Sequence, residues 1–183
     1  MFLRRAYNTH PEFAFGVRQM LPQSLGIAAW GLMTGVAMVQ SGMSTVEAMA
    51  MTLLVFAGSS QLAAIPLIAA SAPVWVILAT SFCVNLRFVV FSAHLRVYVM
   101  YLPRWARLLA GYVTADMTYV LFVRRYAHPA TAPAEREAQM AYLAGGGALN
   151  WASWQLASLT GIALAQSVPL QWGLGFAGIL ALT

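Results

Sequence analysis

The sequence predicts an all-α polytopic membrane protein with about five to six transmembrane segments, at least one of them broken or re-entrant. Hydrophobic residues make up 61% of the 183-residue chain and charged residues only 8%, whereas soluble domains carry roughly 25% charged residues. Five stretches are apolar enough to cross a bilayer core of about 30 Å, which needs about 20 residues of helix. Polar groups interrupt some of these stretches, which indicates irregular helices.

The expected spans follow one another with short connections, which make neighbouring helices antiparallel. Ser44 begins the second span and Pro73 begins the third, and Pro103 ends the region of the third span before the fourth begins. The polar stretch 124–137, with three arginines, two glutamates and two prolines, separates the fourth span from the fifth. In order, the spans are residues 21–41, 44–71, 73–95, 105–123 and 139–165, and a sixth apolar stretch occupies residues 170–183.

The chain divides into an N-terminal lead-in, residues 1–20, and a single transmembrane domain, residues 21–183. The lead-in carries four charged side chains and lacks an apolar core of signal-peptide length. A chain of 183 residues has room for one membrane domain. No Gly/Ser linker or low-complexity tract marks another domain.

All ten basic residues are arginines, and nine of them fall into three groups beside apolar stretches. Such groups favour the cytoplasmic side of a membrane and contact anionic lipid, so nucleic-acid binding is not expected. Three simple crossings would place the first two groups on opposite sides, so a re-entrant segment is expected between them. The last two groups flank a single span, so one of them must be an exception to the rule that basic groups lie on the cytoplasmic side. The groups are Arg4/Arg5/Arg18, Arg96/Arg104/Arg107 and Arg124/Arg125/Arg136.

The run Gly58-Ser59-Ser60-Gln61 lies inside the second apolar stretch. Where a membrane helix unwinds, its free N–H and C=O groups must face protein or a wet cavity. Half-helix N-termini then direct the positive ends of their dipoles at substrate carboxylates. We therefore expect a helix break here that lines a substrate path. The alternative is helix packing through small residues.

Asn85 and Arg87 interrupt the third stretch and are expected to divide it. An arginine inside a membrane costs about 2.5–3.5 kcal/mol on insertion scales, so it needs a partner or a cavity. We predict that Arg87 is buried with an acidic or carbonyl partner. Asp116 is the first candidate and Glu47 the second. The alternative is that Arg87 extends to the membrane interface.

Asp116 is the only acid well inside a predicted span. A carboxylate in that position can relay protons or bind a substrate ammonium group. The alternative is a structural ion pair or a helix end near the surface.

The fifth span contains Gly145-Gly146-Gly147, followed by Asn150 and Trp154. Three glycines cost a helix about 1 kcal/mol each unless close packing uses them, so a close helix contact is expected. Asn150 and Trp154 are further candidates for the substrate path. The alternative is that Trp151 and Trp154 divide between lipid and core.

These residues make the chain similar to the AzlC-type branched-chain amino-acid permease family, from about residue 16 to 182. The Phe-Ala-Gly-Ser-Ser-Gln and Asn-Leu-Arg blocks, in this order, are fairly specific to that family. The segments that carry the resemblance are Gly16-Val17-Arg18-Gln19-Met20-Leu21-Pro22-Gln23-Ser24-Leu25-Gly26, Leu54-Val55-Phe56-Ala57-Gly58-Ser59-Ser60-Gln61, Asn85-Leu86-Arg87 with Ser92, and Ser153-Trp154 before Gly161.

The resemblance implies the large subunit of a bacterial inner-membrane exporter of branched-chain amino acids, paired with a small AzlD-type membrane subunit. The family tends to have His and Tyr where Phe88 and Phe91 stand, and a second acid where Met117 stands. These departures remove polar groups near the expected path. The family also runs some 50 residues longer, so truncation of the C-terminal part is expected.

The leading hypothesis is a carrier that exports small apolar amino acids by alternating access, without a cofactor. Ser59, Ser60 and Gln61 would bind the carboxylate, and Asp116 the ammonium group or a coupling proton. A membrane scaffold or assembly subunit is the alternative. An integral membrane enzyme is less favoured, because no nucleophile, base and metal site occur at suitable spacing.

Overall fold

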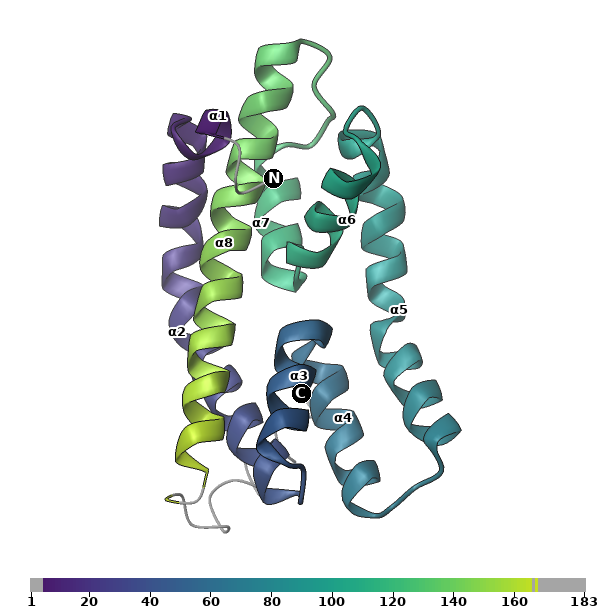
Figure 1. Cartoon of the computed structure of the whole chain (residues 1–183). Coiled ribbons are helices and arrows are strands. Elements are labelled where there is room, and N and C mark those ends of the chain that lie inside the picture. The colour runs from purple at the N-terminus through teal and green to yellow at the C-terminus, as the bar shows by residue number, and fades with distance from the viewer. Residues whose placement is uncertain (1–4, 166, 168–183) are drawn as a thin grey trace. The chain divides into compact units, whose positions relative to one another are not determined.

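The computed structural model describes residues 5–165 and 167, and every regular element among them is an α-helix. The all-α prediction is confirmed. The helices, labelled in Figure 1, are α1 (Arg5–Asn8), α2 (Pro11–Gln40), α3 (Thr45–Val55), α4 (Gly58–Ala69), α5 (Val74–Val99), α6 (Arg104–Val113), α7 (Asp116–Arg125) and α8 (Pro133–Leu164).

By length and composition, α5 is the one described helix that could cross a membrane by itself. The α6–α7 pair meets the same criterion only when taken together, and it is bent by 108°. Helices α3 and α4 are apolar but short. The predicted number of five to six spans is therefore not confirmed, and the stretch 170–183 lies outside the described residues.

Two helices begin earlier than the sequence predicts. Helix α2 starts at Pro11, inside the predicted lead-in, and continues to Gln40. Helix α8 starts at Pro133, inside the predicted polar loop, because the fixed φ of proline suits the first position of a helix. Whether residues 1–20 form a separate lead-in stays a prediction.

Helix α5 runs from Val74 to Val99 without interruption, so the prediction that residues 85–87 divide it is wrong. The side chains of Asn85 and Arg87 donate hydrogen bonds to serines of α4 instead of competing for the backbone of α5. Polar side chains compete with a helix when they form hydrogen bonds to backbone groups nearby. Here the partners lie on another helix, and α5 stays continuous.

The chain forms two compact units. Unit 1 comprises residues 1–25 and 88–152, and unit 2 comprises residues 26–87 and 153–183. Each unit holds parts of the three long helices α2, α5 and α8, together with one pair of short helices separated by two residues. Nine of the ten arginines and four of the five acidic residues belong to unit 1, while unit 2 has Arg87 and Glu47 alone.

The core of unit 1 is aromatic. Phe122 of α7 is completely buried, and its ring packs edge-on against Tyr98 of α5 at 5.2 Å. The Tyr98 hydroxyl donates to the Tyr126 carbonyl at 2.9 Å. Tyr142 of α8 packs on the same cluster, so α5, α7 and α8 share one core in this unit.

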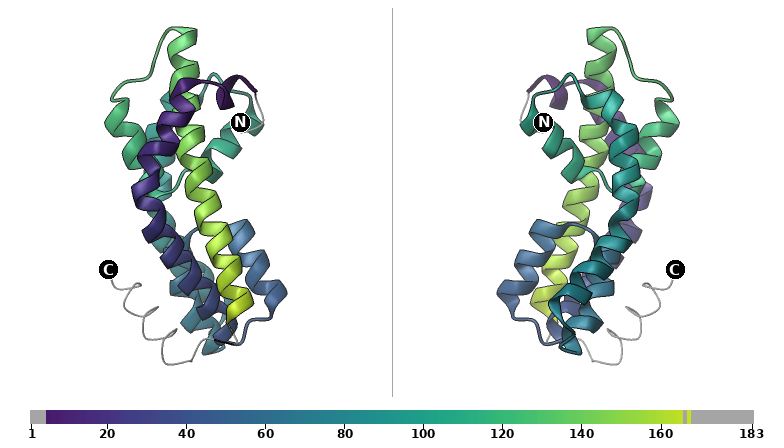
Figure 2. Two further views of the ribbon diagram at one scale, coloured as in Figure 1. Left: turned by 90° about the vertical axis from the view of Figure 1, so that its left-hand side faces the viewer. Right: turned by 90° about the vertical axis from the view of Figure 1, so that its right-hand side faces the viewer.

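Helices α2 and α8 lie side by side (Figure 2), and glycines allow their backbones to approach. In unit 1, a Cβ at Gly16 would overlap the Tyr142 carbonyl, and one at Gly145 would overlap the Phe13 carbonyl. In unit 2, a Cβ at Gly35 would overlap another α8 carbonyl. The predicted close contact at the triple glycine is therefore confirmed. Small residues at such contacts are typical of helix packing in membranes.

Candidate functional site

The predicted interruption near residues 58–61 is confirmed, and it falls just before them. Helix α3 ends at Val55, Phe56 adopts a left-handed conformation with φ of 43°, and α4 begins at Gly58. A left-handed non-glycine residue costs about 1–2 kcal/mol. Packing offsets this cost, since the Phe56 ring lies edge-on to Trp154 at 6.5 Å and is nearly buried.

Helix α4 runs back beside α3, so the pair forms a hairpin within unit 2 (Figure 1). The Gln61 side chain links the two helices by donating from Nε2 to the Met51 carbonyl at 3.3 Å. Ser44 and Glu47 form a capping box at the start of α3. Glu47 thus has a helix-capping role and is no longer a favoured partner for Arg87.

The N-terminus of α4 has no side-chain cap. Ala57 occupies the cap position, and the first helical bond runs from the Gln61 amide to the Ala57 carbonyl at 3.0 Å. The amides of Gly58, Ser59 and Ser60 therefore lack acceptors in their own helix, as at every helix start. These amides and the helix dipole make this end attractive to an anion.

Polar side chains surround this helix start. The Ser60 hydroxyl donates to the Ala57 carbonyl at 2.9 Å and accepts from Asn85 Nδ2 at 3.2 Å. The half-buried Arg87 guanidinium donates to the Ser59 hydroxyl. The partner thus identified for Arg87 is a hydroxyl, while the predicted pairing with Asp116 stays a prediction.

Two buried amide oxygens of this cluster accept no hydrogen bond from any described residue. They are Gln61 Oε1 and Asn85 Oδ1. The network fixes their orientation: the Met51 carbonyl can only accept, and the single proton of Ser60 already goes to Ala57. Each amide must therefore present its nitrogen to that partner. An unsatisfied buried acceptor costs about 1–3 kcal/mol, so these oxygens are suited to a ligand that donates.

Trp154 forms the wall opposite Gly58. Trp154 is 5% exposed, and its ring packs edge-on against Trp30 at 6.1 Å. A Cβ at Gly58 would overlap the six-membered part of the ring, so glycine is required for this contact. Trp151 is half-buried and donates to the Tyr112 hydroxyl at 3.1 Å, so Trp154 is the tryptophan in the core.

A second break lies between α6 and α7. Thr114 and Ala115 are extended, and the pair of helices is bent by 108°. The predicted span over residues 105–123 is therefore not one continuous helix, and whether the bent pair crosses the membrane stays a prediction. The Thr114 hydroxyl donates to the Ala110 carbonyl at 2.6 Å, which satisfies an end carbonyl of α6. Asp116 is the first residue of α7, so its carboxylate lies at the positive end of the helix dipole.

The two units divide the predicted site residues. Asp116 and Asn150 belong to unit 1, where Asn150 is buried in α8 and Asp116 is half-buried. The other seven belong to unit 2: Gly58, Ser59, Ser60, Gln61, Asn85, Arg87 and Trp154. Contacts among these seven make the α4 N-terminus the best-defined polar site in unit 2.

Sequence reasoning missed a second polar network in unit 2. The Thr52 hydroxyl of α3 donates to Ser158 Oγ at 2.9 Å, and Gln155 Nε2 donates to the Thr52 carbonyl at 2.9 Å. All three residues are buried. Gln155 and Ser158 lie three residues apart on α8, and this spacing of polar residues in an apolar stretch was a readable signal. The network attaches the hairpin to α8.

No group of three His, Cys, Asp or Glu side chains suited to a metal ion occurs in the part of the chain that the structure describes. The polar site is made of hydroxyls, amides and one guanidinium. Such groups can bind and orient a polar solute.

Comparison with known proteins gives one family. A family model described as AzlC protein matches residues 22–168, which include all nine predicted site residues. Neither a curated protein nor a solved structure matches the chain. The AzlC family is associated with branched-chain amino-acid transport and is not an enzyme family. Since the match covers most of the chain, the protein belongs to the AzlC family.

Proposed function

We propose that the protein is the large subunit of an exporter of branched-chain amino acids in the bacterial inner membrane. It would bind its substrate at the start of α4, work by alternating access, and act together with a small AzlD-type membrane subunit. Family membership supports the transport class. The arrangement of donors and acceptors around α4 supports an amino acid as the substrate.

A zwitterion presents a carboxylate that accepts hydrogen bonds and an ammonium group that donates them. The α4 amides and the Arg87 guanidinium are donors suited to the carboxylate. The free oxygens of Gln61 and Asn85 are acceptors suited to the ammonium group. Donors suited to a carboxylate and two buried amide oxygens without a donor occur within one hydrogen-bonded cluster, and this arrangement is the observation that carries the proposal.

The arginine distribution supports a topology in which α2 and α8 cross the membrane as well as α5, although α5 is the one described helix that meets the criterion of length and composition by itself. The shortest of them has 26 residues, about 39 Å of helix, which exceeds a bilayer core of about 30 Å. If the α3–α4 and α6–α7 pairs are re-entrant, all three arginine groups lie on one side. Both exceptions to the positive-inside rule then disappear, and this side is the cytoplasm.

Asp116 would hold the coupling proton. It follows directly on the break between α6 and α7, where an unwound helix can give a carboxylate access to water. Replacement by asparagine keeps the shape of the side chain and removes the titratable group. We expect Asp116→Asn to abolish the response of efflux to an imposed proton gradient.

Efflux of radiolabelled leucine and valine from proteoliposomes, with and without the small subunit, tests the transport proposal. We expect saturable efflux that Gln61→Leu and Asn85→Leu each reduce at least tenfold. Ser24→Ala is the matched control, since its partly exposed hydroxyl bonds only to the Leu21 carbonyl of its own helix. Absence of saturable efflux in the presence of the small subunit would favour the scaffold alternative and refute the carrier.

Cysteine labelling in a Cys83→Ser background tests the topology. A re-entrant α3–α4 hairpin places cysteines at Thr45→Cys and Ala70→Cys on the same side of the membrane, and His128→Cys on the other. If the first two label from opposite sides, the hairpin crosses the membrane and the proposed topology is wrong. All three positions lie at helix ends or in a loop and are exposed.

A further inference from the structure

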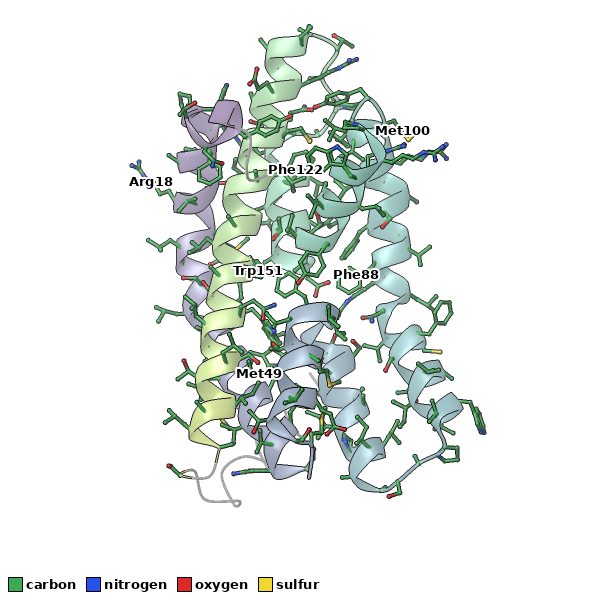
Figure 3. All side chains as sticks on the ribbon, in the orientation of Figure 1. Arg18, Met49, Phe88, Met100, Phe122 and Trp151 are labelled. Carbon is green, nitrogen blue, oxygen red and sulfur yellow. The ribbon has the colours of Figure 1, made fainter. Side chains whose placement is uncertain are left out.

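Unit 1 contains an apolar pocket of about 290 Å³ among α5, α6 and α8. Phe91 and Leu95 line it from α5, and Leu143 lines it from α8. Phe88 is the first α5 residue in its wall, and Met100 follows directly on the end of α5; both are labelled in Figure 3. Ligand pockets span roughly 300–1,000 Å³, so this one would accept a narrow apolar group.

Two arginines, Arg96 of α5 and Arg107 of α6, also line the pocket. Arg107 donates from a guanidinium nitrogen to the Met100 sulfur at 3.1 Å, and a thioether is a weak acceptor. Of the residues that the structure describes, no carboxylate forms an ion pair with either guanidinium. The pocket therefore combines an apolar interior with two positive charges that lack an anion.

We propose that this pocket binds one anionic phospholipid, with its phosphate at Arg96 and Arg107 and an acyl chain along Phe91 and Leu143. Guanidinium groups match phosphate oxygens in charge and geometry. Basic pockets between transmembrane helices on the cytoplasmic side bind acidic lipid headgroups, and unit 1 carries nine of the ten arginines. The inference rests on the membrane location proposed above and is independent of the substrate.

Native mass spectrometry of the purified chain in detergent, titrated with dioleoyl phosphatidylglycerol or dioleoyl phosphatidylcholine, measures the binding directly. We expect tighter binding of the phosphatidylglycerol. Arg96→Gln and Arg107→Gln should each weaken it about fivefold, and the double variant about 25-fold. Arg104→Gln is the matched control, because this exposed arginine begins the same helix but does not line the pocket.

Gly111→Leu tests where the acyl chain lies. Gly111 lines the pocket, and a Cβ built on it meets no atom within 4 Å, so a larger side chain can be added to the pocket wall without overlapping the backbone. It should weaken binding of phosphatidylglycerol without lowering the melting temperature in lipid-free detergent, since leucine favours a helix more than glycine does.

Four results would overturn the proposal. The first is equal binding of the two lipids, and the second is a loss of phosphatidylglycerol binding in Arg104→Gln as large as in the pocket variants. The third is unchanged phosphatidylglycerol binding in Gly111→Leu. The fourth is binding of glycerol phosphate, which has no acyl chain, as tight as that of phosphatidylglycerol. Displacement of the lipid by leucine would make the pocket part of the substrate path instead. None of these measurements requires transport, so failure of the transport proposal would leave the lipid result unaffected.

Discussion

Replacement of Gly58 by alanine should destabilise the protein, because the new methyl group would overlap the Trp154 ring. The ring cannot easily move away, since it is nearly buried and packs against Trp30 and Phe56. Overpacking of this kind costs about 1–3 kcal/mol. For a chain of this length, each kcal/mol lowers the melting temperature by about 2–4 °C.

A compensating substitution makes the test specific. The overlapped atoms belong to the six-membered part of the indole, and phenylalanine lacks the outer part of that ring system. Trp154→Phe alone leaves a cavity and should also cost stability. In the double variant the methyl group occupies part of that cavity. The loss of stability in the double variant should therefore be smaller than the sum of the two single losses by about 0.5–3 kcal/mol.

The assay is thermal unfolding in detergent, followed by intrinsic fluorescence for all four proteins of the cycle. Gly26→Ala is the control, since a Cβ there meets no atom within 4 Å. It should be neutral or stabilise by about 0.4–1 kcal/mol. A Gly58→Ala protein as stable as the wild type, or strictly additive variants, would refute the proposed contact.

Two further predictions concern polar contacts. Thr52→Val removes the donor to Ser158 and to Gln155 Oε1, so it should lower the free energy of unfolding in detergent by about 1 kcal/mol. Thr160→Val, which removes an exposed hydroxyl on α8, is the control and should change this free energy very little. Equal effects of the two substitutions would contradict a role for the network. The side-chain hydrogen bond from Arg125 lowers the pKa of Glu12 below its usual 4.5. A lowered folded-state pKa stabilises the protein above the unfolded-state value, and the gain is lost as the pH falls through the folded-state pKa. Between about pH 5 and pH 3, the free energy of unfolding of the wild type should therefore fall further than that of Glu12→Gln. The difference should be at most about 1 kcal/mol, because the ion pair is partly exposed. Parallel pH profiles of the two proteins would exclude this contribution.

The first helix break could be predicted because its cause is local. Gly58 and the three polar residues after it lie next to one another in an apolar stretch. The break at Thr114 and Ala115 has no glycine, and the apolar stretch around it reads as continuous. The buried residues of α6 recur at Ala106, Ala110 and Val113, as in a short amphipathic helix, but this pattern is visible only once burial is known.

The continuity of α5 could not be predicted because its cause is not local. Asn85 and Arg87 look like an interruption until their partners on α4 are known, and these lie 25 and 28 residues away along the chain. Partners at such distances cannot be read from a single sequence. The free side-chain oxygen of Gln61 could not be predicted from the sequence either. It is identified only because the structure shows that the side-chain nitrogen donates to the Met51 carbonyl.

The uneven distribution of charge between the two units has an electrical consequence. Among the seven predicted site residues of unit 2, Arg87 is the only one that ionises, and a guanidinium keeps its charge throughout the physiological pH range. A zwitterion has no net charge, so its passage beside this cluster moves no net charge through the membrane field. One elementary charge is worth about 2.3 kcal/mol per 100 mV. A measured dependence of efflux on membrane voltage would therefore originate outside this cluster, with Asp116 and its proton as the first place to look.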